Sequence, residues 1–211
     1  MKRLLAYIEE HYASAQAFAG LHHVSSGGDL VRPELMERAK SIFTNAEIFV
    51  IYGCSEVACM GCTYAVRRDA AMMATLVGKP FPGVSVQLLD ESLHAVPVGS
   101  DGEICFAGAG ITLGYLHMPE LTADKYVLIG GQRFYRTGDI GRLDASGNLE
   151  MFGRRDFQIQ LRGMRIELPE IDAHLHRIPG VADAVAWAMP SEANELSLIA
   201  YIVLDRKAPA D

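Results

Sequence analysis

The chain has 211 residues, of which 50% are apolar and 21% charged, so it is long enough to bury a substantial core in one large or two small domains. A formal net charge of −7, without a cluster of Lys and Arg, argues against a nucleic-acid binder. Every apolar run is much shorter than the about 18 residues that span a bilayer, so we predict a soluble, cytoplasmic chain with no membrane partner.

The N-terminal third has the pattern of an α/β unit. Apolar residues at helical spacing predict a helix within residues 2–18. A second helix is expected to end near Phe43, with Ser26 or Asp29 near its cap and Pro33 in its first turn.

The apolar run 48–52 predicts a strand that is covered on both faces and completes a strand, helix, strand unit. Ligands in such sheets bind at the carboxyl ends of the strands. Gly28 and Tyr52 fall at two such ends, which makes both of them candidate binding positions.

The pattern of apolar and turn-forming residues changes over residues 76–152. Short alternating runs separated by Gly, Pro and Asp-Gly or Ser-Gly pairs predict antiparallel β structure there. Further on, we expect a hairpin around 162–163, a helix over 169–177, and strands over 182–188 and 196–203, which together suggest a βαβ-like remainder.

Four segments carry a resemblance to a known family: Tyr52-Gly53-Cys54-Ser55-Glu56, the Gly-rich stretch 102–116, Tyr135-Arg136-Thr137-Gly138-Asp139, and the polar stretch 153–171. In this order they resemble the motifs of adenylate-forming enzymes, a superfamily that includes acyl-CoA synthetases and luciferases. The match is closest to the adenylation domains of nonribosomal peptide synthetases. Cys54 and Ser55 depart from the family's Tyr-Gly-Pro-Thr-Glu motif, and Gln160 stands where many relatives have a lysine.

The resemblance implies a fold of mixed α/β and β class. Residues 1–155 would form the C-terminal portion of an adenylation core, with an α/β layer over about 1–75 and a distorted antiparallel β-barrel over about 76–155. Residues 156–211 would begin the small, mobile α+β C-terminal subdomain, with Asp156 as the hinge.

Asp139 is the first candidate for nucleotide binding. A carboxylate can accept hydrogen bonds from two vicinal hydroxyls, and the resemblance implies that Asp139 binds the ribose of ATP or AMP. The alternative is a turn aspartate that caps local amides. Arg154 follows a loop glycine and can grip ribose or phosphate oxygens through paired donors, unless it is only a solvated surface arginine. The other nucleotide-binding positions implied by the resemblance are Tyr52, Ser55, Gly28 and Arg165.

Glu56 lies just beyond the predicted strand end, where a carboxylate oxygen suits Mg2+ bridged to nucleotide phosphates. The resemblance implies this metal role, whereas an acid at the start of a helix is the alternative. The resemblance also assigns an acyl-substrate pocket, whose members are equally plausible as core residues: Val24, Ser26, Ile51, Cys59 and Met60.

Three family features are missing from the sequence, one of which is the aspartate that usually holds the substrate's amino group. The other two concern phosphate binding and catalysis. These are the Ser/Thr/Gly-rich phosphate loop with its lysine and the late Asn-Gly-Lys motif, since Lys207 lacks that context. The catalytic set is therefore incomplete, and we predict that the chain alone is nearly inactive in adenylate formation and relies on complementing protein segments.

The first functional hypothesis is a part of an adenylation domain. It would activate an amino or other carboxylic acid with ATP and pass the acyl group to a thiol, the phosphopantetheine of a carrier protein or coenzyme A. An acyl-CoA synthetase fragment is one alternative, and a non-catalytic AMP-binding or scaffolding module is another. A third arises from Cys54, Cys59 and Cys62, whose C-x4-C-x2-C spacing with Cys105 further on matches plant-type iron–sulfur ferredoxins.

Overall fold

The computed structural model describes residues 1–12, 14–28, 30–156, 158–161, 164–190 and 196–205. The chain divides into two compact units, Met1–Arg155 and Asp156–Asp211. The division falls directly before Asp156, the position for which the resemblance implies a hinge. Among the described residues, no helix is long and apolar enough to cross a membrane.

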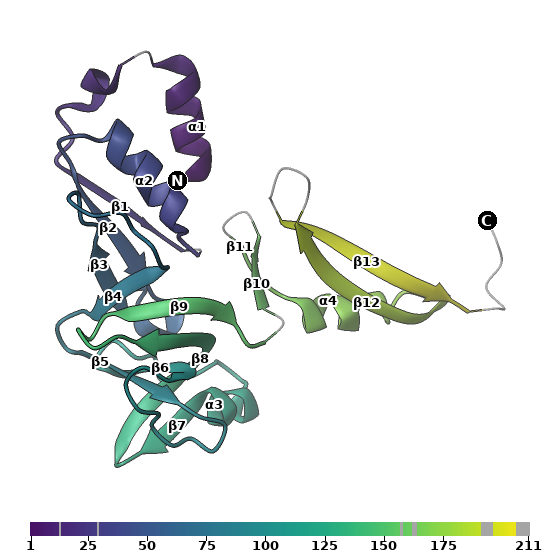
Figure 1. The fold of residues 1–211 in the computed structure, drawn as a ribbon. Helices are drawn as coiled ribbons and strands as arrows, with labels where there is room; N and C mark the ends of the chain where they lie inside the picture. The colour runs from purple at the N-terminus through teal and green to yellow at the C-terminus, as the bar shows by residue number, and fades with distance from the viewer. Residues whose placement is uncertain (13, 29, 157, 162–163, 191–195, 206–211) are drawn as a thin grey trace. The chain divides into compact units, whose positions relative to one another are not determined.

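The first unit begins with helices that pack beside two parallel strands (Figure 1). Its first elements are α1 (Lys2–His11), the 3-10 turn η1 (Ala15–Phe18), β1 (His23–Gly27), α2 (Pro33–Ile42) and β2 (Glu47–Tyr52). β1 pairs with β2 in parallel, which confirms the predicted α/β unit. In β2, Ile48 and Val50 are buried whereas Phe49 and Ile51 are only partly so, and the expected cover on both faces is therefore incomplete.

The first helix covers only part of residues 2–18, the range within which it was predicted. It ends at His11, and Tyr12 has an extended backbone. The side chain of Ser14 accepts a hydrogen bond from the amide of Gln16 at 3.1 Å, and a separate 3-10 turn follows. Serine competes with helical hydrogen bonding by capturing a nearby amide, which explains why the helix does not continue to residue 18.

The predicted cap of the second helix was wrong. Arg32 occupies the N-cap position without a side-chain cap, and Pro33 begins the helix. Proline fixes φ near the helical value and lacks the amide hydrogen that a cap would satisfy, so this start needs no serine. Ser26 lies within β1 instead, and Asp29 lies outside the described residues.

The rest of the first unit is antiparallel, as predicted for residues 76–152. After the 3-10 turn η2 (Ser55–Val57), its elements are β3 (Cys62–Ala65), β4 (Leu76–Pro80), β5 (Val84–Leu89), β6 (Asp101–Gly108), α3 (Pro119–Lys125), β7 (Tyr126–Ile129), β8 (Gln132–Leu143) and β9 (Leu149–Arg154). One nine-stranded mixed sheet runs in the order β1-β2-β3-β4-β9-β8-β6-β5, with β7 paired to β8. The mixed fold class is confirmed, but the strand path stays open at β5, and the described part of the chain forms no closed barrel.

A continuous apolar core joins the helices to the sheet. It extends from Leu5 and Met36 in the helices through Val50 to Phe106 and Tyr135, all of which are fully or almost fully buried. The strands also approach one another closely at Gly27, where an added Cβ would lie 2.3 Å from the carbonyl oxygen of Ile51. The carboxyl end of β1 is therefore held directly against the end of β2.

The second unit is built from two antiparallel hairpins and one helix. Its elements are β10 (Gln158–Leu161), β11 (Met164–Glu167), α4 (Leu168–Leu175), β12 (Val181–Pro190) and β13 (Leu196–Leu204). β10 pairs with β11, and β12 pairs with β13, both antiparallel. The predicted strands and helix are confirmed, but their βαβ-like reading was wrong. The strands that flank α4, β11 and β12, belong to different two-stranded sheets and so do not pair with each other.

Candidate functional site

A bulge in β8 presents Asp139. β8 pairs with β6 at Arg136↔Cys105 and again at Ile140↔Glu103, so three residues of β8, residues 137–139, lie opposite the single residue 104 of β6. Bulges of this kind bend a strand and redirect a side chain, and they are common beside binding sites. Gly138 has a φ of 78°, a left-handed conformation that glycine adopts without strain.

Thr137 fixes the shape of this bulge from within. Its hydroxyl donates to the carbonyl of Ile104 at 2.8 Å and accepts from the amide of Asp139 at 3.0 Å. Thr137 is buried, so these bonds are shielded from competition with water. The backbone that carries the Asp139 carboxylate is therefore tied to the neighbouring strand.

Asp139, Arg154 and Tyr52 converge, although they come from three different strands. Asp139 and Arg154 are cross-strand partners in β8 and β9. The Arg154 guanidinium donates to Asp139 Oδ1 at 2.9 Å and to the carbonyl of Thr137 at 2.8 Å. Tyr52, the last residue of β2, donates its hydroxyl to the second carboxylate oxygen of Asp139. Burial, followed by the charge of Asp139, raises the pKa of Tyr52 well above its usual value, so the phenol stays a donor.

Glu56 lies one turn beyond β2, in a buried position. Tyr115 donates its hydroxyl to Glu56 Oε1 at 2.6 Å, and the amide of Thr112 donates to the Glu56 carbonyl at 2.9 Å. Burial and the Glu56 hydrogen bond raise the pKa of Tyr115, which keeps this donor protonated. The Glu56 side chain is thus held in a fixed place, and a carboxylate oxygen is a ligand type that Mg2+ accepts.

The loop that carries Glu56 is strained and tightly closed. Ala58 and Cys59 both have left-handed φ angles, 54° and 59°, which non-glycine residues rarely adopt. An added Cβ on Gly53 would lie 2.6 Å from the carbonyl carbon of Cys59, so only glycine fits there. Ser55, Cys59 and Met60 are exposed on this loop and lie near the Glu56 backbone in sequence.

The predicted acyl pocket is not gathered on one face. In β1, Val24 and Ser26 pair with Ile48 and Val50, whose side chains are buried in the core. Ile51 pairs with Gly27 instead and therefore points to the opposite side of the sheet. The pocket assignment stays a prediction, for which the described contacts supply no common cavity.

Gly28 directly follows β1, with a φ of 81°, and an added Cβ would meet no atom within 4 Å. It is exposed at the carboxyl end of β1, next to the end of β2 that carries Tyr52. A glycine in this conformation permits close backbone approach by a ligand.

The two remaining candidates belong to the second unit. Arg165 is exposed in β11, opposite Gln160 in β10. Asp156 begins the unit, and its carboxylate accepts from the amide of Gln158 at 3.2 Å, a local turn contact.

The cysteines are distributed in a way that does not favour an iron–sulfur site. Cys62 and Cys105 are fully buried in β3 and β6, and burial raises the pKa of both thiols to about 12. A metal-binding thiol needs the opposite shift, toward the thiolate. Across the described residues, no three or more His, Cys, Asp or Glu side chains are grouped to hold a metal ion.

The sequence reasoning missed Glu103, Arg136 and Tyr115 as members of this region. Glu103 is buried beneath the bulge, where it binds Arg136 and the amide of Gly138. One signal was available, because Glu103 interrupts an apolar strand that is otherwise buried, and a charge in such a strand needs a partner. Tyr115 gave no such signal, since its contact with Glu56 joins residues 59 positions apart.

The chain is similar in sequence to a known family and to several known proteins. Residues 1–116 match the family model described as AMP-binding enzyme. The chain is 41% identical over 162 residues to tyrocidine synthase 3 of Brevibacillus parabrevis, covering 74% of this chain and 2% of that protein. It is 32% identical over 196 residues to surfactin synthase subunit 2 of Bacillus subtilis, covering 92% of this chain and 5% of that protein.

A solved structure gives the same result for the fold. Holo-PA1221, an NRPS protein containing adenylation and PCP domains, superimposes with a TM-score of 0.80 at 28% identity. The match covers 93% of this chain and 35% of that one. The chain thus spans a small part of the length of the curated relatives that it matches.

Proposed function

Because the chain belongs to the AMP-binding enzyme family, we propose that it supplies the ribose-binding half of an adenylation site. The carboxylate substrate would attack the α-phosphorus of ATP, forming an acyl-adenylate and releasing pyrophosphate. A thiol would then attack the acyl carbon and release AMP. An amino acid is the first candidate substrate, and the phosphopantetheine of a carrier protein the first candidate thiol, because relatives are peptide synthetases with adenylation and PCP domains.

The cluster of Asp139, Arg154 and Tyr52 carries this proposal. Ribose offers two vicinal hydroxyls, which can donate to the Asp139 carboxylate. Arg154 donates to this carboxylate and would also contact the sugar or a phosphate oxygen. The ring of Tyr52 would lie against the base. Its hydroxyl would give up its hydrogen bond to Asp139, and the ribose hydroxyls would then donate to that carboxylate.

The remaining residues have roles toward the phosphates. Glu56 would hold Mg2+, which when bound would neutralise charge on the phosphate oxygens. Ser55 can donate its hydroxyl to a phosphate oxygen, and Gly28 would let the backbone approach the nucleotide. Arg165 would contact phosphate in one orientation of the second unit, with Asp156 as the hinge between orientations.

Calorimetric titration of AMP with Mg2+ into the full chain tests this proposal. Asp139→Ala should lose at least about tenfold in affinity, because a carboxylate makes charge-assisted hydrogen bonds with the sugar. Asp101→Ala is the matched control. Like Asp139, Asp101 forms an ion pair with an arginine on a neighbouring strand, here Arg142 at 2.6 Å, but Asp101 is exposed. The ribose site is disproved if the unmodified chain fails to bind AMP or if Asp139→Ala binds it equally well.

A complementing segment that carries the family's lysine motifs separates enzyme from binding module. The enzyme hypothesis expects exchange of labelled pyrophosphate into ATP once that segment is added. AMP binding without any exchange in the mixture would favour the non-catalytic module.

A further inference from the structure

We propose that Glu103 is a positioning residue, whose buried carboxylate sets the conformation of the bulge that presents Asp139. The inference rests on the proposed role of Asp139 in ribose binding. In this role Glu103 would not contact the ribose. It acts through Gly138 and Arg136, the residues that flank Thr137 in the bulge.

Both oxygens of the Glu103 carboxylate are used beneath the bulge. Oε1 accepts from the amide of Gly138 at 3.1 Å, and Oε2 accepts from Arg136 Nε at 3.1 Å and from its terminal nitrogen at 2.7 Å. Glu103 is 4% exposed. Charge-assisted hydrogen bonds of this kind are about twice as strong as neutral ones, and a buried set is hard for water to replace.

The bulge explains why a side chain is needed there. With three residues of β8 opposite one of β6, the bulge interrupts the regular ladder, and the amide of Gly138 donates to a side chain, the Glu103 carboxylate. A buried amide without an acceptor is costly, and the Glu103 carboxylate provides that acceptor. On its other side, the Gly138 carbonyl accepts from the amide of Arg155 at 2.8 Å. The backbone that precedes Asp139 is thus fixed from two directions.

A purely structural role is the competing explanation, and the chain contains a comparison for it. Asp101 and Arg142 form a second acid–arginine pair across the same two strands, with side chains that are 51% and 43% exposed. That pair lies beyond the bulge, on the far side of Ile140 along β8. Burying an ion pair also brings little net stability, because desolvation offsets the attraction. The buried Glu103 carboxylate also accepts from the Gly138 amide, a contact that a role in strand pairing alone would not need, so the geometry favours positioning.

Glu103→Gln is the sharpest test, with Asp101→Asn as its matched control. The introduced side-chain amide would keep one acceptor oxygen but would turn its NH2 group toward either Arg136 or Gly138, so one donor loses its partner. Two measurements on the full chain follow: hydrogen exchange of the Gly138 and Asp139 amides without ligand, and the affinity ratio between AMP and 2′,3′-dideoxy-AMP.

We expect Glu103→Gln to speed exchange at both amides by about tenfold or more, as for a lost charge-assisted hydrogen bond. The affinity ratio between AMP and dideoxy-AMP should also fall in Glu103→Gln. The Asp139 carboxylate would no longer be held in one orientation, so its hydrogen bonds with the ribose hydroxyls would weaken. Asp101→Asn should change neither quantity. Unchanged exchange in Glu103→Gln, or an unchanged preference in a chain that binds AMP, overturns the inference.

The two proposals fail separately. If the unmodified chain binds no AMP, the ribose site fails, and exchange at Gly138 and Asp139 alone decides the positioning role. If Glu103→Gln does not fold, Arg136→Lys replaces it, since this variant keeps the acceptor for Gly138 but loses the forked contact with Oε2. A faster exchange at the two amides is again expected, and no change would contradict the proposal.

Discussion

The two units of this chain bury their apolar residues to very different extents. In the first unit, helices and the nine-stranded sheet enclose a core that includes large side chains such as Tyr135, Phe106 and Leu149 at 0% exposure. In the second unit, the buried apolar residues among those described are Leu168, Ala184 and Ala186. Precise placement of polar groups depends on rigid, close-packed surroundings. Polar side chains of a binding site would therefore be held more rigidly in the first unit than in the second.

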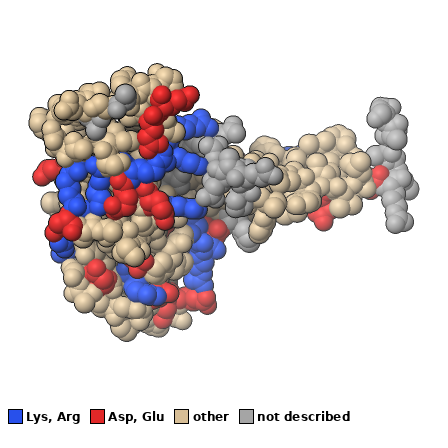
Figure 2. Space-filling view, turned by 45° about the horizontal axis from the view of Figure 1, so that its top comes forward, with Lys and Arg blue, Asp and Glu red and all other residues tan. Residues whose placement is uncertain are grey.

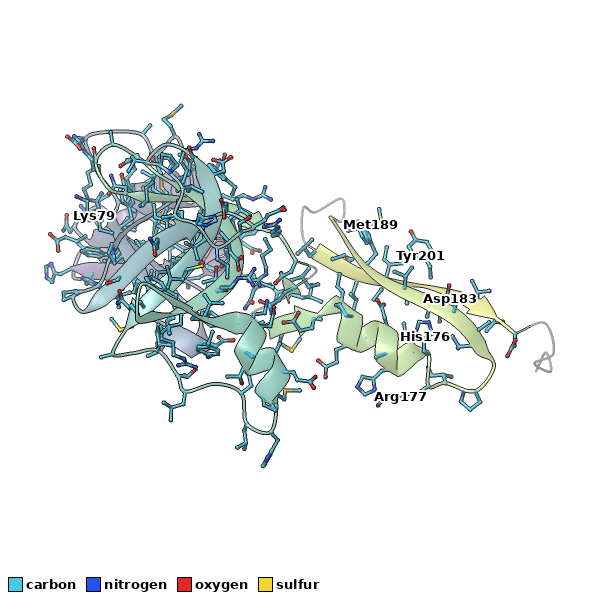
Figure 3. All side chains as sticks on the ribbon, turned by 90° about the horizontal axis from the view of Figure 1, so that it is seen from below. Lys79, His176, Arg177, Asp183, Met189 and Tyr201 are labelled. Atoms are coloured by element: carbon cyan, nitrogen blue, oxygen red, sulfur yellow. The ribbon has the colours of Figure 1, made fainter. Side chains whose placement is uncertain are left out.

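The hairpin of the second unit has an exposed apolar face. Ala184 and Ala186 are buried in β12, which packs with α4, whereas the alternate residues of β12 and their partners in β13 are exposed. These exposed residues are Val185, Trp187, Met189, Ile199, Tyr201 and Val203. Figure 2 shows the visible side of the hairpin almost without charged side chains, and Figure 3 shows Met189 and Tyr201 projecting away from His176, the residue after α4.

The largest expected effect is a cavity in the first unit. Leu149→Ala should lower the free energy of unfolding of that unit by about 3 kcal/mol, because the site is fully buried among large neighbours. Leu204→Ala makes the same chemical change in β13, where the side chain is 66% exposed, and should cost less than about 0.5 kcal/mol. Urea denaturation followed by circular dichroism measures both. Equal losses would contradict the difference between the units.

The apolar face of the hairpin should make the chain self-associate. An exposed apolar patch of this kind is a contact site for proteins, and a two-stranded hairpin is marginal without further cover. Trp187 is the chain's single tryptophan and lies on this face, so its fluorescence reports on the second unit alone. We expect its emission to shift to the blue as protein concentration rises.

A variant that adds charge tests this interpretation. Val185→Lys with Tyr201→Lys places charges on cross-strand partners of the same face and should abolish the concentration dependence, seen also by analytical ultracentrifugation. Leu113→Lys is the control, because Leu113 is 94% exposed in the first unit. A concentration dependence that survives in the hairpin variant but disappears in Leu113→Lys would assign the association to the first unit.

Local patterns predicted the elements better than their pairing. The strand at 48–52, the helix that begins at Pro33 and the antiparallel texture after residue 76 follow from apolar periodicity and from Gly and Pro placement, and all are confirmed. The βαβ-like reading of the last part was wrong because the two strands that flank α4 pair within separate hairpins and not with each other. The end of the first helix depended on one serine that captures an amide.

In the candidate site, too, sequence motifs identified individual residues better than the contacts that depend on strand pairing. Asp139 and Arg154 were chosen from motif resemblance, and their cross-strand pairing brings them within 2.9 Å of each other. Glu103 was missed because its role depends on a bulge, a property of two strands in register rather than of either sequence. Motif resemblance also grouped residues that the fold separates. Val24 and Ile51 both match pocket positions, but the strand register points them to opposite faces of the sheet.

The smallest predicted effect is a pH dependence confined to the second unit. His176, which follows α4, places Nδ1 2.7 Å from the carbonyl of Asp172 and Nε2 3.0 Å from Asp183 Oδ1, and Figure 3 shows His176 and Asp183 pointing toward each other. Because both ring nitrogens face acceptors, first the carbonyl and then the Asp183 carboxylate raise the pKa of His176 above its usual value. The charged form is thus favoured in the folded unit.

The sign of this effect follows from linkage. A raised pKa in the folded state adds stability that is fully present below the usual histidine pKa of about 6.5 and is lost as pH rises through the raised value. His176→Gln should remove this dependence from the second unit, whereas His94→Gln, at an exposed ion pair with Asp90 in the first unit, should leave it intact. An NMR titration of the His176 ring measures the shift directly, and a pKa at or below the usual value would show that its two acceptors do not hold the charged ring.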